Sequence, residues 1–203
     1  MKQKDNTTEE LILQEARKAF TQKGLAGARM QDIADKAGIN KALVHYYFKS
    51  KENLFTIIFE QEFGKFFSHL ATVLSADIPL FEKIEQVVSL DIERLSQYPD
   101  IALFVINELS HNPDRMTKRF KQMGTENILA IFQQQINSEV KKRTIKKITA
   151  QQLLINIQSL SVFPILAKPM IKKVMQLTEK QYQEMIQLRK KEVAAFIISA
   201  IKN

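Results

Sequence analysis

The side chains with the clearest chemical potential lie in and just after one short segment of the chain. Lys41, Ala42, His45 and Tyr46 fall on one face of an α-helix at about 100° per residue. A lysine can donate to guanine O6 or N7, and an alanine can contact the methyl group of thymine. Tyrosine hydroxyls and the ammonium of Lys51 can donate to phosphate oxygens. This pattern predicts a surface suited to the major groove of DNA.

The elements that must position this surface form a predicted helix-turn-helix. Helices are expected over 30–37 and 41–48, separated by a short turn that contains Gly38. Glycine can take the positive φ that such a turn requires. Ala34 is small where the two helices must approach closely. The apolar residues expected to set the angle between the helices are Ile33, Ala37, Ile39 and Val44.

Amino-acid composition restricts the possible fold classes but does not identify a binding partner. Only 5 Gly and 5 Pro in 203 residues argue against turn-rich sandwiches and barrels, and 45% hydrophobic residues suit a globular protein. Cysteine is absent, which excludes disulfides, thiolate metal sites and a cysteine nucleophile. The net charge of +8 permits an anionic partner. Residues 1–55 carry 10 basic and 7 acidic side chains, so the positive charge is not concentrated there.

Capping signals divide the rest of the chain into helices. Thr followed three residues later by Glu or Gln predicts helix starts near residues 7, 149 and 178. No convincing strand or repeat is visible, so we expect an all-α fold. The expected helices outside the helix-turn-helix are 8–23, 51–75, 79–97, 100–110, 113–142 (kinked at Gly124), 150–164, 170–177 and 179–202.

Residues 12–55 resemble the DNA-binding domain of the TetR family of transcriptional regulators. The stretch 12–20 with Gly24 is similar to the first helix of that family, and 32–39 with 47–55 is similar to the remainder. The resemblance implies a three-helix DNA-binding domain on a larger helical ligand-binding and dimerisation domain. It also implies a homodimer on a near-palindromic double-stranded operator, and no cofactor.

The resemblance also assigns roles and shows departures. It implies that Gln31, Lys41, Ala42 and Tyr46 face bases, whereas His45, Tyr47 and Lys51 hold phosphates. Arg29 stands where the family usually has a capping Ser or Thr, His45 where it most often has Tyr, and Ala42 where Gly or Pro is frequent. A neutral hydrogen-bond donor is the simpler role for His45, with pH-dependent binding as the alternative. The full candidate DNA-binding set is Arg29, Gln31, Asn40, Lys41, Ala42, Leu43, His45, Tyr46, Tyr47 and Lys51.

We predict two domains: 6–66 for DNA binding, with the helix-turn-helix motif at 29–48, and 67–203 for effector binding and dimerisation. An unknown small-molecule effector would enter the second domain, because pockets in helical bodies are lined by apolar and aromatic side chains. Alternatively, the phenylalanines of 51–75 pack in the hydrophobic core and line no pocket. The candidate effector-binding residues are Phe63, Phe67, Tyr98, Phe104, Asn107, Glu108 and His111.

Apolar stripes on the helices 150–164 and 179–202 are candidates for the dimer interface. In the resembled family the last two long helices pair with their symmetry mates; alternatively, both stripes simply close the core of the monomer. Arg189 falls within the second stripe and could pair with an acidic group across the interface. The candidate interface residues are Leu153, Ile157, Leu160, Tyr182, Ile186, Arg189, Val193, Ile197 and Ile201.

The leading functional hypothesis is a sequence-specific transcriptional regulator, a repressor that a small molecule releases from its operator. The alternative is a helical ligand- or protein-binding module without DNA-binding activity. An enzyme lacks support, because no paired His and carboxylate, Gly-rich phosphate loop or nucleophile motif is visible, and no metal site is expected. The apolar run 160–171 is interrupted by two prolines and a lysine, and no signal peptide is visible. We therefore expect a cytoplasmic protein without a membrane partner.

Overall fold

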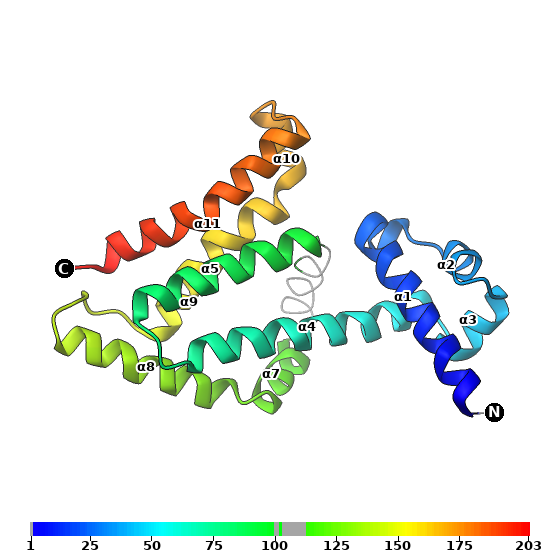
Figure 1. Ribbon diagram of the computed structural model, residues 1–203, viewed down its shortest axis with the longest axis horizontal. Helices are drawn as coiled ribbons and strands as arrows, with labels where there is room; N and C mark the ends of the chain where they lie inside the picture. Colours follow the sequence, from blue (N-terminus) through cyan, green and yellow to red (C-terminus); the bar gives the residue numbers. More distant parts are fainter. Residues whose placement is uncertain (1, 100–101, 103–112) are drawn as a thin grey trace. The chain divides into compact units, whose positions relative to one another are not determined.

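The computed structural model describes residues 2–99, 102 and 113–203 (Figure 1). These residues form α-helices joined by short connections, and their only β-type pairing is an isolated bridge between Ile145 and Lys202. The all-α prediction is confirmed. By internal contacts the chain divides into two units, Met1–Lys65 and Phe66–Asn203.

The first unit contains α1 (Lys2–Gly27), α2 (Met30–Lys36), α3 (Lys41–Phe48) and the first part of α4 (Lys51–Ser75). Its core brings together apolar side chains from all four helices; among them, the rings of Phe20 and Phe55 meet edge to face with centroids 5.0 Å apart. Further core side chains of this unit are Ile12, Ala16, Ile33, Ala34, Val44, Phe48, Leu54 and Ile58.

The start of α1 differs from the prediction. The helix begins at Lys2, so the predicted capping signal near residue 7 lies inside it. Gly24 interrupts the helix as expected, with φ 68° and ψ 176°, but a further turn continues to Gly27. A capping motif predicts a helix start only if the preceding residues do not themselves become helical.

The second unit contains the end of α4, then α5 (Leu80–Gln97), α7 (Pro113–Gln122), α8 (Thr125–Lys141), α9 (Ala150–Leu166), α10 (Lys168–Val174) and α11 (Glu179–Ile201). α5, α9 and α11 pack side by side and supply most of the core (Figure 1). The single helix expected over 113–142 is two helices, because Gly124 takes a left-handed conformation with φ 74° and ends the first of them. The predicted helix 100–110 lies outside the described residues.

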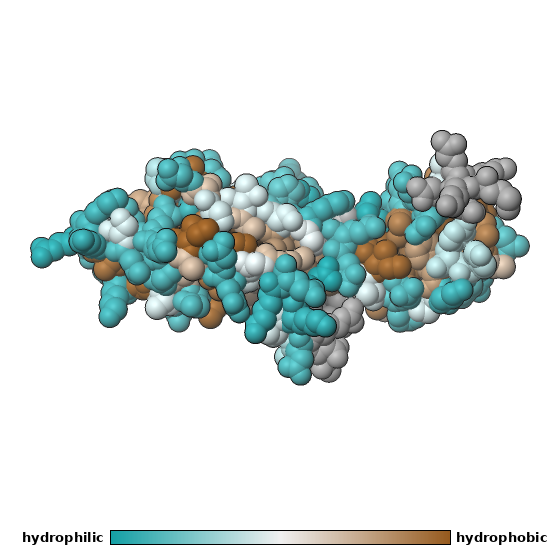
Figure 2. Space-filling view, turned by 90° about the horizontal axis from the view of Figure 1, so that it is seen from below, coloured by the Kyte–Doolittle hydropathy of each residue, from teal (hydrophilic) through white to brown (hydrophobic). Residues whose placement is uncertain are grey.

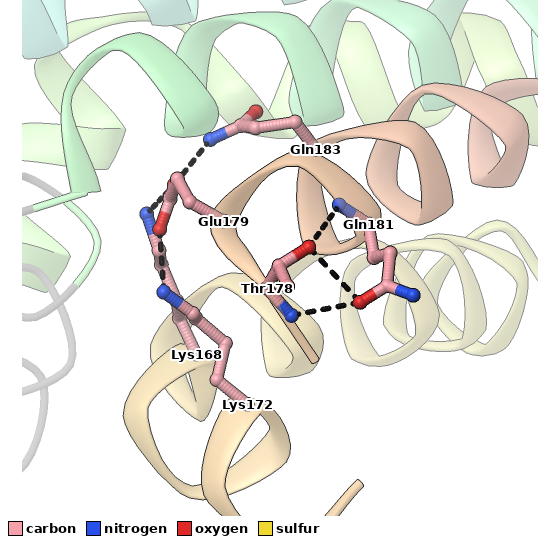
Figure 3. A network of polar contacts seen from close by, with 6 residues as sticks. All are labelled: Lys168, Lys172, Thr178, Glu179, Gln181 and Gln183. Carbon is pink, nitrogen blue, oxygen red and sulfur yellow. Dashed lines mark hydrogen bonds and ion pairs between the residues drawn. The ribbon is translucent and has the colours of Figure 1, made fainter. Parts of the chain in front are cut away.

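The turn before α11 is held by two sets of polar contacts (Figure 3). The predicted capping box is present: the backbone N–H of Gln181 donates to Thr178 Oγ1 at 3.2 Å, and that of Thr178 donates to Gln181 Oε1 at 2.9 Å. Lys168 and Lys172 of α10 both reach Glu179, at 2.6 and 2.7 Å. These contacts lower the pKa of Glu179 to about 2, the bond from Lys168 contributing most. The ion pairs tie α10 to the first turn of α11.

Two ionisable side chains are buried among the described residues of the second unit. Lys83 Nζ donates to the carbonyl oxygen of Leu74 at 2.8 Å and so satisfies a backbone acceptor in the last turn of α4. Burial lowers the pKa of Lys83, against the opposing charge of Asp77. Asp91 of α5 accepts a hydrogen bond from Gln158 of α9 at 2.6 Å. Such groups cost free energy unless they are paired or neutral.

Most of the residues predicted for the dimer interface pack in the chain's own core, which favours the alternative that these stripes close the monomer. The apolar residues among them are at most 6% exposed, apart from Leu160, which is half-buried. Arg189 is also engaged within the chain, where Nη2 donates to the carbonyl oxygen of Leu160 at 2.7 Å. Side chains covered by their own chain offer no surface to a second copy. The residues concerned, whose place at an interface stays a prediction, are Leu153, Ile157, Leu160, Tyr182, Ile186, Arg189, Val193, Ile197 and Ile201.

Other apolar side chains of the same two helices do reach the surface. Ile155 and Phe163 of α9 are 59% and 58% exposed, and Leu188 and Phe196 of α11 are 55% and 65% exposed. Figure 2 shows hydrophobic surface at several places among mostly hydrophilic side chains on the face that it presents. α9 and α11 therefore carry apolar residues both in the core and on the surface.

No single helix within the described ranges has the length and apolar composition to cross a bilayer; the bent pair α9 and α10, which meet at 68°, passes that test only when taken together. One face of α9 packs in the core. In the same residues, no group of three or more His, Cys, Asp or Glu side chains is arranged to hold a metal ion.

Candidate nucleic-acid interface

The turn between α2 and α3 is built from local backbone requirements. Gly38 has φ 68°, the left-handed conformation predicted for it. Asn40 begins α3 as its N-cap, and its side-chain oxygen accepts the backbone N–H of Ala42 at 2.9 Å. Asn40 therefore orders the start of α3, and its side-chain N–H groups remain free to donate to DNA.

The two helices meet through small and β-branched side chains. Ile33, Ala34 and Val44 have no exposed surface, whereas Ala37 and Ile39 are half-buried. Phe48, at the end of α3, is 1% exposed. Val44 and Phe48 therefore anchor one side of α3 and determine which of its side chains face outward.

The opposite side of α3 is exposed, as predicted. Lys41, Ala42, His45 and Tyr46 are all exposed, and Tyr46 reaches 69%. Leu43, also in the candidate DNA-binding set, is 37% exposed. The structure therefore brings a lysine, a small residue, a histidine and a tyrosine to one surface.

Tyr46 is held between two neighbours. Its ring meets that of Tyr47 edge to face, with centroids 5.4 Å apart and an angle of 84° between the planes. Lys49 Nζ lies 5.4 Å from the centroid of the Tyr46 ring, within the range of a cation–π contact. Tyr47 is half-buried. These contacts orient an exposed hydroxyl and place a positive charge beside it.

The residues from α2 are less available than the pattern suggested. Gln31 Nε2 donates to Asp35 Oδ1 one turn later at 2.7 Å, which uses one of its two N–H groups and leaves the other and the amide oxygen for a base. Arg29 precedes α2 in extended conformation and makes no side-chain cap. It is exposed. Because Arg29 does not cap α2, its exposed side chain is available for other contacts.

Polar contacts fix α2 against α1 and order the start of α4. Lys23 of α1 pairs with Asp32 of α2 at 2.7 Å, and this bond lowers the pKa of Asp32. Half-buried Lys51 begins α4, where the backbone N–H of Asn53 donates to Ser50 Oγ at 3.1 Å. Free N–H groups of a first helical turn favour anions such as phosphate.

The family is decided by sequence comparison. Residues 12–57, which include α2, α3 and the start of α4, match the bacterial regulatory proteins of the TetR family. This segment of the chain is a TetR-family DNA-binding domain. RutR from Escherichia coli (strain K12), an HTH-type transcriptional regulator, is 31% identical over 119 residues, which are 57% of this chain and 56% of RutR. The chain therefore matches little more than half the length of that relative.

Other proteins are similar to this chain beyond its first unit. YttP from Bacillus subtilis (strain 168) is 25% identical over 172 residues, 83% of this chain and 82% of YttP. The crystal structure of a TetR/AcrR-family transcriptional regulator from Thermobifida fusca superimposes with a TM-score of 0.63. It is 15% identical and covers 96% of this chain and 98% of its own. This last likeness supports the fold alone.

One candidate residue of this TetR-family domain was missed in the sequence. Lys49 is exposed, directly follows α3, and has φ 63°, an unusual conformation for a lysine. Its backbone carbonyl lies 3.1 Å from His45 Nδ1, and its ammonium lies over Tyr46. The spacing of four residues from His45 was available in the sequence, but the left-handed backbone that brings the carbonyl to the ring was not.

The candidate effector residues are only partly described. Phe63 and Phe67 of α4 are buried, and Phe67 contacts Phe120 of α7 with centroids 5.8 Å apart. Tyr98 is half-buried at the end of α5. Phe104, Asn107, Glu108 and His111 lie outside the described residues. A shallow cavity on α7 is lined instead by Asp114, Thr117, Lys118, Lys121 and Gln122.

Proposed function

We propose that this protein is a sequence-specific DNA-binding transcriptional regulator, and most simply a repressor. The observation that carries the proposal is the outward face of α3, where Lys41, Ala42, His45 and Tyr46 are exposed while Val44 and Phe48 anchor the helix. This face lies within the segment that matches the TetR family. A helix so anchored can enter the major groove with its polar side chains toward the base edges.

The proposed contacts separate into two kinds. Lys41 and Ala42 read base edges, because a lysine donates to guanine and an alanine contacts the thymine methyl. Tyr46 and Gln31 join them, the latter through the N–H group and amide oxygen that its bond to Asp35 leaves unused. Lys51 and Tyr47 contact phosphates and position the domain. Arg29, Asn40 and Leu43 complete the proposed DNA-facing set.

The proposed assembly is a homodimer on a near-palindromic operator, as is typical of the family. Its two recognition helices would occupy half-sites about 34–36 Å apart. We place the interface on the exposed apolar residues of α9 and α11, in place of the buried stripes. Phe163 and Phe196 are its strongest candidates, because large exposed aromatic side chains gain most from being covered.

We further propose that a small-molecule effector binds the second unit and releases the operator, as is typical of the family. Phe67 and Tyr98 are the described candidates for its site. A regulator of this kind works beside the chromosome, so we propose a cytoplasmic location.

The test is selection of binding sites from a pool of random double-stranded DNA, followed by affinity measurements between about 50 and 200 mM salt. Lys41→Ala should relax the preference at one position of each half-site. Lys51→Ala should weaken binding to all sequences and reduce the salt slope by about 1 per half-site. Lys191→Ala, which removes the same charge from an exposed position of α11, is the matched control and should change neither property.

The alternative is a helical ligand- or protein-binding module. Failure of the wild-type protein to select any palindrome at low salt would favour that alternative. Equal effects of Lys41→Ala and Lys51→Ala on all sequences would contradict the division into base and phosphate contacts.

A further inference from the structure

Pro164 lies inside α9 and deprives one backbone carbonyl of that helix of its usual donor. In an α-helix the N–H of residue 164 would donate to the carbonyl oxygen of Leu160, but proline has no N–H. The proline ring also crowds that carbonyl, which belongs to the residue four positions earlier. Leu160 is half-buried, and a carbonyl shielded from water costs free energy unless it finds a partner. The helix therefore needs another donor at this point.

Arg189 of α11 supplies that donor. Its Nη2 donates to the carbonyl oxygen of Leu160 at 2.7 Å. Within the described ranges Arg189 forms no ion pair and its buried Nε has no hydrogen-bond partner, whereas the neighbouring Lys190 pairs with Glu93 at 3.6 Å. The half-buried guanidinium is thus oriented by a backbone carbonyl, and no carboxylate directs it.

Tyr182 makes the corresponding contact at the carbonyl of Pro164 itself. It lies two turns before Arg189 on the same face of α11, and its hydroxyl donates to the carbonyl oxygen of Pro164 at 3.0 Å. Lys168 Nζ lies 5.0 Å from the centroid of the Tyr182 ring and also pairs with Glu179 (Figure 3). Successive residues of α11 therefore contact α10, the end of α9, and the turn of α9 that precedes the proline.

Glu179, Tyr182 and Arg189 together form a clasp across the elbow between α9 and α10. The two helices meet at 68°. A proline permits a bend by removing a hydrogen bond, but the contacts on both sides of it determine which angle is held. Phe163 precedes the proline and is 58% exposed, and Val174 of α10 is 73% exposed. The angle of the elbow therefore decides where these apolar side chains reach the surface.

We propose that Arg189 is a positioning residue that replaces the missing N–H of Pro164 and so holds the elbow of α9 and α10 against α11. The guanidinium acts through the carbonyl of Leu160. The inference does not depend on DNA binding, and its failure would leave the proposed function standing. It concerns the end of α9 that carries Phe163, a residue of the proposed dimer interface.

The experiment is a double-mutant cycle in urea unfolding. Arg189→Met keeps an unbranched apolar stem but cannot donate a hydrogen bond. In the wild-type background it should lower the folding equilibrium constant by roughly 10-fold or more, because hydrogen bonds from charged groups are the stronger ones. In a Pro164→Ala background the new N–H at position 164 can donate to Leu160, so Arg189→Met should cost roughly 3-fold or less.

Two matched controls separate this coupling from general effects. Ile165→Val changes the packing beside the proline without adding an N–H, so Arg189→Met should keep its full effect in that background. Lys191→Met removes a positive charge from an exposed position of α11 and should change the folding constant little. Equal losses from Arg189→Met in the wild-type and Pro164→Ala backgrounds would overturn the inference.

Nuclear magnetic resonance gives a readout that does not require the proline variant to fold. With ¹³C placed in the leucine carbonyls, Arg189→Met should move the Leu160 signal upfield, in the direction of a carbonyl that has lost its hydrogen bond. Lys191→Met should leave that signal in place. An unchanged Leu160 carbonyl signal in Arg189→Met would show that the guanidinium does not serve this carbonyl and would overturn the inference.

Discussion

Asp91 is a buried acid whose ionisation the fold opposes. Its side chain has no exposed surface, Gln158 Nε2 donates to Oδ2 at 2.6 Å, and Oδ1 has no hydrogen-bond partner in the described ranges. Burial raises the pKa of this carboxyl to about 8, although the bond from Gln158 favours the ion. Asp91 is therefore a neutral acid at pH 7 in the folded protein.

The sign and size of the effect on stability follow from linkage. The ordinary pKa of an aspartate is 3.8, so above about pH 4 the unfolded chain loses a proton that folded Asp91 keeps. The unfolded state then binds fewer protons, and stability falls with rising pH until about pH 8, where folded Asp91 also ionises. At about 1.4 kcal/mol for each tenfold change in proton affinity, the upper bound is about 6 kcal/mol. Relaxation and water penetration reduce such penalties, so we expect roughly 3 kcal/mol.

Asp91→Asn tests this reasoning, because the amide keeps the shape of the neutral acid and can accept from Gln158 but cannot ionise. Any constant packing difference cancels when the two proteins are compared across pH. The free energy of unfolding of the variant, relative to wild type, should rise by roughly 2 kcal/mol or more between about pH 5 and pH 8.

The assay is urea unfolding followed by far-UV circular dichroism at each pH, with the m-value checked for constancy. Asp114→Asn, at an exposed position of α7, is the matched control and should follow the wild type. Parallel pH curves for wild type and Asp91→Asn would refute the assignment of Asp91 as a buried neutral acid.

Two further predictions concern the turn of the helix-turn-helix and the proposed dimer. Gly38→Ala should destabilise the protein by about 1–2 kcal/mol in urea unfolding, because alanine is strained at φ 68°. A steric clash is not the cause, since an added Cβ would meet nothing within 4 Å. Gly64→Ala, also in open space but inside α4, should instead stabilise it by about 0.5–1 kcal/mol; destabilisation of equal size by both would remove the conformational explanation. Phe196→Lys should give folded monomers by analytical ultracentrifugation, since Phe196 is 65% exposed, whereas Ile197→Lys, at 3% exposure, should unfold the protein. An unchanged dimer of Phe196→Lys would exclude that residue from the interface.

The helix-turn-helix was predictable because its determinants are local. The left-handed Gly38, the small Ala34 and the buried pair Val44 and Phe48 all act within about twenty residues of sequence. Helical periodicity then decides which side chains of α3 share a face. The amino-acid sequence by itself therefore determined the all-α class, the helix-turn-helix and the outward face of α3.

The partner of an apolar helix face was not predictable. Periodicity shows which residues share the face but not which element packs against it. α11 is apolar at Ile197, which packs in the core, and at Phe196, which faces solvent. The raised pKa of Asp91 depends on its burial in the core, and the contact of His45 with the Lys49 carbonyl depends on the backbone turn at Lys49. Only the tertiary structure decided these points, since burial and the position of a carbonyl arise when separate elements pack together.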